Sequence, residues 1–211
     1  VFIPQKNKKI KTLLSELTSN SLISSPENTY NDFDYEGMIY KKLSEEGPAL
    51  AVGDVNNDGN EDIFLGGAKG QPGIIYLHQG TGKLAIKKQP VFDQDNYYED
   101  TAASFLDADG DGDLDLIVAS GGNEVGRKEV FKPRLYLNDG NGNFKKSENE
   151  LPSAFQNMSV VAPEDFDGDG DIDVFIGSRS VVGVYGIDPT HLFLENVGGG
   201  KLVNATERLA Y

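Results

Sequence analysis

Cysteine and tryptophan are absent from the 211-residue sequence, and histidine occurs only twice. Without cysteine, neither a disulfide framework nor a thiolate metal site can form. The two histidines, His78 and His191, stand in unrelated contexts, so no histidine-based metal site or nucleophile is expected. No run of about 18 apolar residues occurs, so no segment of this sequence is expected to cross a membrane as a helix.

Basic residues are scarce relative to acidic ones: 19 Lys and Arg stand against 34 Asp and Glu, which gives a net charge of −15. A nucleic-acid partner requires a basic face, so the composition argues against one. Fourteen of the 34 acidic residues lie in three nine-residue windows, 54–62, 107–115 and 165–173. The rest of the chain has 20 acidic residues against 19 basic ones. The acidity is therefore concentrated at three places, and it requires a local cause there.

The three windows mark a repeat of roughly 50–60 residues. Each window lies between two short apolar runs, and a third run, such as 135–137, leads into a glycine-rich turn and a fourth apolar segment. These runs are too short for helices and rich in branched or aromatic residues, which predicts strands. Four short antiparallel strands form one blade of a β-propeller. We therefore predict an all-β fold with three complete four-stranded blades, at about 46–96, 97–152 and 153–211.

Residues 1–45 do not follow the repeat pattern and are expected to form an N-terminal lead-in. Within it, residues 30–40 could supply strands to a preceding blade. Three blades are too few to close a ring, because stable propellers usually have four to eight. We therefore expect either a fragment of a larger propeller or a ring that blades from another chain complete.

Each acidic window has oxygen-bearing side chains at positions 1, 3, 5, 7 and 9 and a glycine at position 6. Ca²⁺ prefers six to eight oxygen ligands, and such a loop can wrap one ion, with a backbone carbonyl contributing at position 7. The glycine permits a sharp turn around the ion. We expect about three Ca²⁺ ions, one per window, and we consider Mg²⁺ less favourable because it retains more water. The candidate ligands are Asp54, Asn56, Asp58, Asn60 and Asp62; Asp107, Asp109, Asp111, Asp113 and Asp115; and Asp165, Asp167, Asp169, Asp171 and Asp173.

Two other structures could contain such windows. An EF-hand places a bidentate glutamate at position 12, where this sequence has Leu65, Val118 and Ile176. Simple Asx-rich turns also favour Asp and Gly, but three copies at the same place in three repeats disfavour that explanation. The windows are thus predicted to be calcium-binding loops of β-hairpins.

The pattern D-x-[DN]-x-D-G-x-x-D between two strands, with a later L-[YF]-L strand and a glycine-rich turn, resembles the FG-GAP/VCBS repeat of integrin-α-like propellers. The segments 46–59 and 135–144 are similar to bacterial VCBS proteins of the ASPIC/UnbV type. The resemblance covers about residues 46–207. It implies a secreted or surface-anchored propeller, on the outer surface or in the periplasm of a bacterium, that serves in binding or adhesion.

We expect a noncatalytic binding module in which calcium has a structural role, with no catalytic residues and no further cofactor. The expected partner is a protein or carbohydrate at the cell surface, recognised by the longer connections 123–133 and 179–190. One alternative is a calcium-dependent polysaccharide-active enzyme, although the carboxylates are committed to the windows and no tryptophan is present to stack on a sugar. The other alternative is a subunit of a larger outer-surface assembly.

Overall fold

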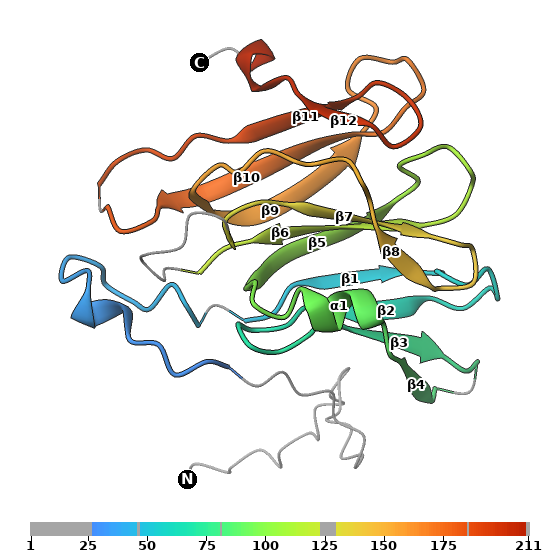
Figure 1. Ribbon diagram of the computed structural model, residues 1–211, viewed down its shortest axis with the longest axis horizontal. Coiled ribbons are helices and arrows are strands. Elements are labelled where there is room, and N and C mark those ends of the chain that lie inside the picture. The colour runs from blue at the N-terminus through green and yellow to red at the C-terminus, as the bar shows by residue number, and fades with distance from the viewer. Residues whose placement is uncertain (1–26, 46, 81, 123–129, 185, 210–211) are drawn as a thin grey trace, which may run out of the picture.

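The computed structural model describes residues 27–45, 47–80, 82–122, 130–184 and 186–209 (Figure 1). Within these ranges the chain is all-β and forms three four-stranded antiparallel sheets. This confirms the predicted fold class and the three predicted blades. The strands are β1 (Leu50–Gly53), β2 (Asp62–Leu65), β3 (Ile74–His78), β4 (Leu84–Lys87), β5 (Asp100–Leu106), β6 (Asp115–Ser120), β7 (Arg134–Asn138), β8 (Phe144–Lys146), β9 (Gln156–Glu164), β10 (Asp173–Val181), β11 (Leu192–Asn196) and β12 (Leu202–Asn204).

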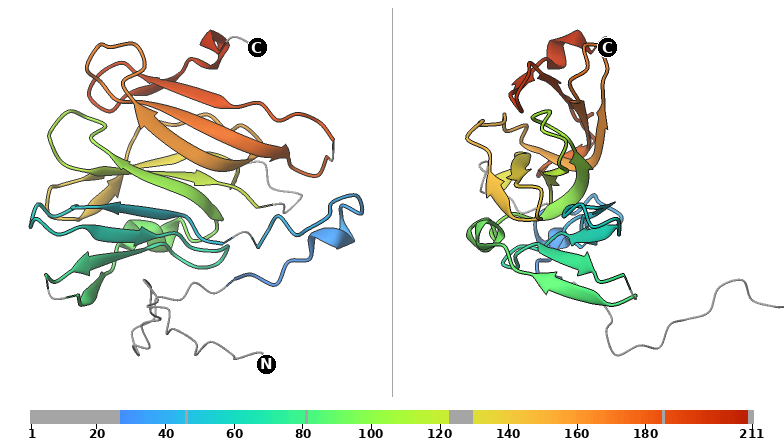
Figure 2. Two further views of the ribbon diagram at one scale, coloured as in Figure 1. Left: turned by 180° about the vertical axis from the view of Figure 1, so that it is seen from behind. Right: turned by 90° about the vertical axis from the view of Figure 1, so that its right-hand side faces the viewer.

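Each sheet is a meander in which the strands pair in chain order: β1 to β4, β5 to β8, and β9 to β12. We call these sheets blades one, two and three. The blades lie side by side, and β5, the first strand of blade two, lies against both β1 and β9 (Figures 1 and 2). These three blades do not form a closed ring.

Two hydrophobic cores fill the spaces between neighbouring blades. Successive residues of a strand point to opposite faces of the sheet, so Leu116 of β6 faces blade one and Ile117 faces blade three. Both side chains are fully buried, and each contributes about 1.5–3 kcal/mol to stability. The core between blades one and two includes Phe64, Ile75, Leu116, Tyr136 and Phe144. The core between blades two and three includes Ile117, Leu135, Val174, Leu194 and Leu202.

Each acidic window joins the first strand of its blade to the second, as the sequence predicts. We call 54–62 loop one, 107–115 loop two and 165–173 loop three. The last aspartate of each loop is already the first residue of a strand, and it pairs across the hairpin with the last residue of the strand before it. All three loops lie at one end of the sheets, on the right in Figure 1.

The segments before, between and after the sheets contain a few short helices. The described part of the lead-in, 27–45, contains the 3-10 helix η1 (Asp32–Asp34) and no strand, so residues 30–40 do not extend a sheet here. Ser44 donates hydrogen bonds to the Asp32 carboxylate from its backbone N–H and from Oγ, which folds this segment back on itself. The helix α1 (Pro90–Gln94) links blades one and two, with proline in its first turn and Phe92 buried. The 3-10 helix η3 (Thr206–Arg208) follows β12.

No helix in the described ranges is long and apolar enough to cross a membrane.

Candidate metal centres

The first aspartate of each loop is oriented by backbone N–H groups of the same loop. In loop two, Gly110 N donates to Asp107 Oδ1 at 2.8 Å, and Gly112 N donates to Oδ2 at 3.0 Å. The glycine at position 6 has a positive φ in every loop, between 84° and 99°, as the predicted sharp turn requires. The corresponding donors are Asp58 and Gly59 to Asp54, and Gly168 and Gly170 to Asp165.

Position 4 of each loop also has a positive φ, which the ligand pattern did not predict. Asn57 has φ 57°, and Gly110 and Gly168 both have φ 79°. Asparagine and glycine are the residues that adopt this conformation most readily. Their presence at position 4 of all three windows was therefore a usable signal for a second left-handed turn.

The aspartates of loops two and three each bring three carboxylates close enough to contact a single ion. Carboxylate oxygens of Asp107, Asp109 and Asp111 lie within 4.8 Å of one another. Ligands at 2.3–2.6 Å on opposite sides of a Ca²⁺ ion are about 5 Å apart, so this group fits a single ion. Partial burial and the charge of Asp111 raise the pKa of Asp109, as expected for like charges held together without a cation. In loop three the grouped residues are Asp165, Asp167 and Asp173.

Loop one differs in its donor set. Asn56 and Asn60 replace two of the five aspartates, and no three of its acids form such a group in the described chain. Asn60 donates to Asp58 Oδ1 from its side chain and its backbone N–H, both at 2.8 Å, and these bonds hold the pKa of Asp58 below its usual value. Loop one thus offers fewer negative charges than the other two loops.

The aspartate at position 9 is a buried structural link as well as a candidate ligand. Asp115 is 1% exposed; its Oδ2 accepts Ala108 N at 3.0 Å, and its Oδ1 accepts Asn138 N at 2.8 Å. It therefore ties loop two to the end of β7. Burial raises the pKa of Asp115 to about 6. The same two bonds join Asp62 to Val55 and His78, and Asp173 to Phe166 and Asn196. Each oxygen keeps a further lone pair, so a metal bond is still compatible with this role.

The side chain at position 7 lies against the turn that joins the third and fourth strands. A Cβ placed on Gly140 would meet the Asp113 carboxylate, and one on Gly198 would come near Asp171. Asp113 Oδ1 also accepts a hydrogen bond from Asn57 of loop one, at 2.8 Å. The side chains at position 7 thus lie beside these turns, and the backbone carbonyl is the ligand that position 7 would provide.

Asparagines at the ends of β7 and β11 connect each loop to the neighbouring blade. Asn138 Nδ2 donates to the carbonyl of Val55 in blade one at 2.8 Å and to Leu114 in its own loop at 3.0 Å. Asn196 Nδ2 makes the equivalent bonds to Ala108 in blade two and to Ile172. Because Val55 and Ala108 also donate to the position-9 aspartates of their own loops, one series of hydrogen bonds runs through all three loops. The loops thus lie at blade junctions.

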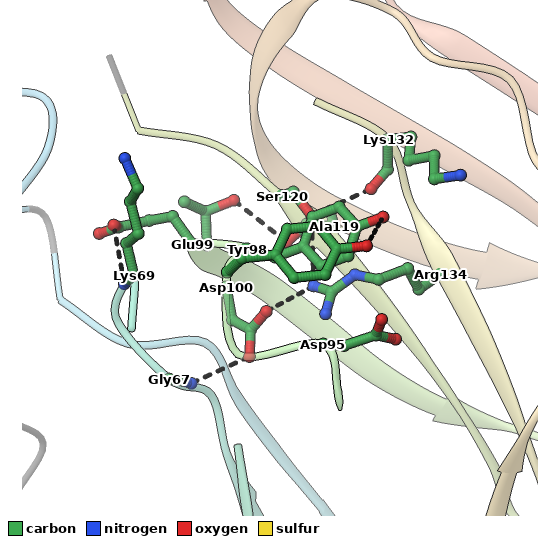
Figure 3. Close-up of polar contacts among 12 residues, drawn as sticks. Gly67, Lys69, Asp95, Tyr98, Glu99, Asp100, Ala119, Ser120, Lys132 and Arg134 are labelled. Atoms are coloured by element: carbon green, nitrogen blue, oxygen red, sulfur yellow. Dashed lines mark hydrogen bonds and ion pairs between the residues drawn. The ribbon is translucent and has the colours of Figure 1, made fainter. Parts of the chain in front are cut away.

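A second polar group lies where β5 and β7 begin, at the end of these strands away from the acidic loops. Figure 3 shows Arg134, Asp100, Tyr98 and Asp95 of this group. Arg134 of β7 is 4% exposed, forms an ion pair with Asp100, and lies 4.1 Å from the centroid of the Tyr98 ring. Tyr136 donates to Asp95 at 2.7 Å, and Lys146 bonds both oxygens of Asp95. The cavity beside these groups has a volume of only about 10 Å³, which is about one water molecule. The group stabilises the junction, and Arg134 and Lys146 also line a separate cavity of about 300 Å³.

The described parts of the two predicted recognition connections follow β6 and β10, at the end of the blades away from the acidic loops. Residues 123–129 and Tyr185 fall outside the described residues. β10 runs to Val181, so Arg179 belongs to a strand and the connection is shorter than the predicted 179–190. Between this connection and the lead-in lies a groove of about 370 Å³. Its lining includes Ile39, Tyr40, Arg179, Val184, Ile187 and Asp188. The lead-in had not been predicted to take part.

A model of the FG-GAP-like repeat matches the sequence at residues 54–118 and 107–176. Each match begins at the first aspartate of a loop and ends in the second strand of the next blade. A comparison with curated proteins finds no significant match. Together the two family matches cover residues 54–176, which is more than half of the 211 residues. The chain therefore belongs to the FG-GAP-like repeat family.

Proposed function

We propose that the chain is a calcium-stabilised, noncatalytic binding module of a secreted or cell-surface protein. The observation that carries this proposal is the repetition of one oxygen-rich loop geometry at three blade hairpins, two of which gather three carboxylates within 4.8 Å. Oxygen-only donor sets of this kind suit Ca²⁺. Membership of the FG-GAP-like family supports a propeller-type binding role outside the cell.

Calcium would act mainly on the junctions between blades. Each loop carries like charges that repel in the absence of a cation, and loops one and two are bonded to the next blade through Val55 and Ala108. An ion bound at positions 1, 3 and 5 would neutralise the loop and hold the backbone that the neighbouring asparagine contacts. Three divalent ions would change the formal charge from −15 to about −9.

Recognition is assigned to the groove between the lead-in and the β10–β11 connection. Exposed apolar groups, Tyr40 at 85% and Ile187 at 57%, flank it together with the charged Arg179 and Asp188. A rigid scaffold with such a mixed surface on its connecting loops is suited to binding a protein or a carbohydrate.

The absence of catalysis is supported by the placement of the ionisable groups. The acidic loops use their carboxylates for backbone hydrogen bonds, and the charged groups around Arg134 are paired with one another, Arg134 with Asp100 and Lys146 with Asp95. An enzyme would need two or three convergent groups in an open cleft.

Calorimetric titration with Ca²⁺ tests the metal part of the proposal, because about three ions should bind per chain. Mg²⁺ should bind more weakly than Ca²⁺ in a titration under the same conditions. Incubation with an acidic and a neutral polysaccharide tests the rest. The proposal of a binding module is supported if the wild type binds a polysaccharide without releasing new reducing ends, and if Ile187→Asp abolishes that binding. Release of reducing ends would contradict the noncatalytic role, and no calcium heat at all would contradict the metal assignment.

A further inference from the structure

The three acidic loops share a glycine turn but differ in the charge of their donor sets. At positions 1, 3, 5, 7 and 9, loops two and three each have five carboxylates, whereas loop one has three carboxylates and the amides of Asn56 and Asn60. The affinity of an oxygen site for Ca²⁺ depends on the number of charged ligands and on the rigidity of the site. Loop one therefore attracts a divalent cation less strongly than the other two loops.

The asparagines of loop one also bond to the aspartate at position 5. Asp58 Oδ1 accepts Asn60 N and Asn60 Nδ2, both at 2.8 Å, and Asp58 Oδ2 accepts Asn56 Nδ2 at 3.1 Å. Both oxygens of this candidate ligand are thus bonded to amide donors in the metal-free loop. The two side-chain amides must release Asp58 before an ion can take their place, which lowers the gain from binding.

The aspartate at position 5 has a different environment in loops two and three. Asp111 Oδ1 accepts Asp113 N at 3.0 Å, and Asp169 Oδ1 accepts Asp171 N at 2.9 Å. In the part of the chain that the structure describes, no side-chain amide bonds to Asp111 or Asp169. The neighbouring carboxylates of these loops repel one another, and a cation relieves that repulsion. Loops two and three therefore gain more from binding an ion than loop one does.

Loop one and loop two act on different blade junctions. Val55 of loop one donates from its backbone N–H to Asp62 Oδ2 at 3.2 Å, and its carbonyl accepts Asn138 Nδ2 of blade two at 2.8 Å. Ala108 of loop two makes the equivalent bond to Asn196 of blade three, also at 2.8 Å. Order in loop one thus bears on the junction between blades one and two, and order in loop two on the junction between blades two and three.

We propose that the chain responds to calcium in two steps, with loop one binding the ion about tenfold or more weakly than loops two and three. At low calcium concentrations loops two and three are filled, and the junction between blades two and three is tightened. Loop one fills only at higher concentrations, and the junction between blades one and two then tightens. This junction is the calcium-regulated joint of the molecule. The inference rests on the proposed function, because it requires that the loops bind calcium.

Calcium titration of the isotope-labelled full chain, followed by NMR, tests this inference loop by loop. The position-6 glycines Gly59, Gly112 and Gly170 each donate to the first aspartate of their own loop, so each amide signal reports one loop. The signals of Gly112 and Gly170 should shift first, and that of Gly59 at calcium concentrations about tenfold or more higher. The Val55 N–H should gain protection from hydrogen exchange together with the Gly59 shift, and the Ala108 N–H together with the Gly112 shift.

Exchanging the donor sets of loops one and two gives a matched pair of variants, because Asn and Asp have nearly the same shape. Asn56→Asp combined with Asn60→Asp gives loop one five carboxylates and should bring the Gly59 transition to the calcium concentration of the Gly112 transition. Asp109→Asn combined with Asp113→Asn gives loop two the donor set of loop one. This second variant should move the Gly112 transition to a calcium concentration about tenfold or more higher.

The outcomes separate this inference from the proposed function. If Gly59 and Gly112 shift together in the wild type, or if the exchanged donor sets leave both transitions unmoved, the two-step response is wrong while calcium binding stands. A Gly59 signal that never shifts, although Gly112 and Gly170 do, would also overturn the two-step response. If none of the three signals responds to calcium, both the metal assignment and this inference fail.

Discussion

At the scale of single residues, the aspartates of one loop have two different roles that their common identity conceals. Asp111 is exposed and belongs to the carboxylate group, whereas Asp115 is buried and bonded to two backbone N–H groups. The regular spacing was sufficient to predict the candidate ligands and the glycine turn. The spacing could not show which aspartates form buried structural hydrogen bonds and which are candidate metal ligands only. Asp115 bonds to Asn138, which lies in another strand 23 residues away.

We predict that Asp115→Asn lowers the free energy of unfolding by about 1–3 kcal/mol in EDTA, because the amide cannot accept both N–H groups. Asp111→Asn should have little effect in EDTA, since its side chain is exposed, while weakening calcium binding. Urea denaturation of both variants, with and without calcium, makes the comparison. Equal stability of the two variants in EDTA would contradict the structural role of position 9.

A pH effect is expected at Glu99, outside the loops. Its Oε2 accepts Asn28 Nδ2 at 2.9 Å and Lys69 N at 3.2 Å. Burial, aided by the charges of Glu27 and Asp100, raises its pKa to about 7. An unfolded Glu ionises near 4.5, so the folded state binds the proton more tightly, and stability contributed by protonated Glu99 is lost as the pH rises from about 4.5 to 7.

Glu99→Gln should therefore be more stable than the wild type by about 1–2 kcal/mol at pH 8, after allowance for partial exposure. At pH 5 the difference should be smaller, because the wild-type group is then mostly protonated. Thermal unfolding of both proteins at the two pH values measures the difference. A stability difference that does not change with pH would rule out this titration.

At the scale of elements, the strands followed from short apolar runs, and their order followed from the repeat. The pairing register of the first two strands of each blade could be predicted, because the loop between them has the same length in all three blades. What the sequence did not reveal were contacts between blades. Asn138 and Val55 are 83 residues apart, and nothing local distinguishes Asn138 from an ordinary turn residue. The helix α1 was also missed, since its five residues show too little periodicity, although Pro90 was a helix-start signal.

Asn138→Ala should weaken the junction between blades one and two. The change leaves the carbonyls of Val55 and Leu114 without their buried donor, and we expect a loss of about 1–3 kcal/mol in the free energy of unfolding. Asn141→Ala, in the exposed turn of the same blade, is the matched control and should cost less than about 0.5 kcal/mol. If both substitutions cost the same in urea denaturation, Asn138 would not be the link between the blades.

At the scale of the whole molecule, composition predicted a chain that is neutral apart from three acidic loops, and the structure places those loops at one end of the blades. The position of the loops at blade junctions and the groove at the opposite end could be recognised only from the arrangement of the blades in space. Calcium is thus expected to determine how firmly the blades hold together, and the groove to determine what they bind.

Thermal unfolding in calcium and in EDTA tests this account most directly. At a hundredfold excess over its dissociation constant, each bound ion stabilises the native state by about 2.7 kcal/mol, and each kcal/mol raises the Tm by about 2–4 °C in a chain of this size. We predict that chelation lowers the Tm by several degrees or more, and that a variant with Asp107, Asp109 and Asp111 changed to Asn loses about a third of that shift. An unchanged melting curve in EDTA would contradict the account.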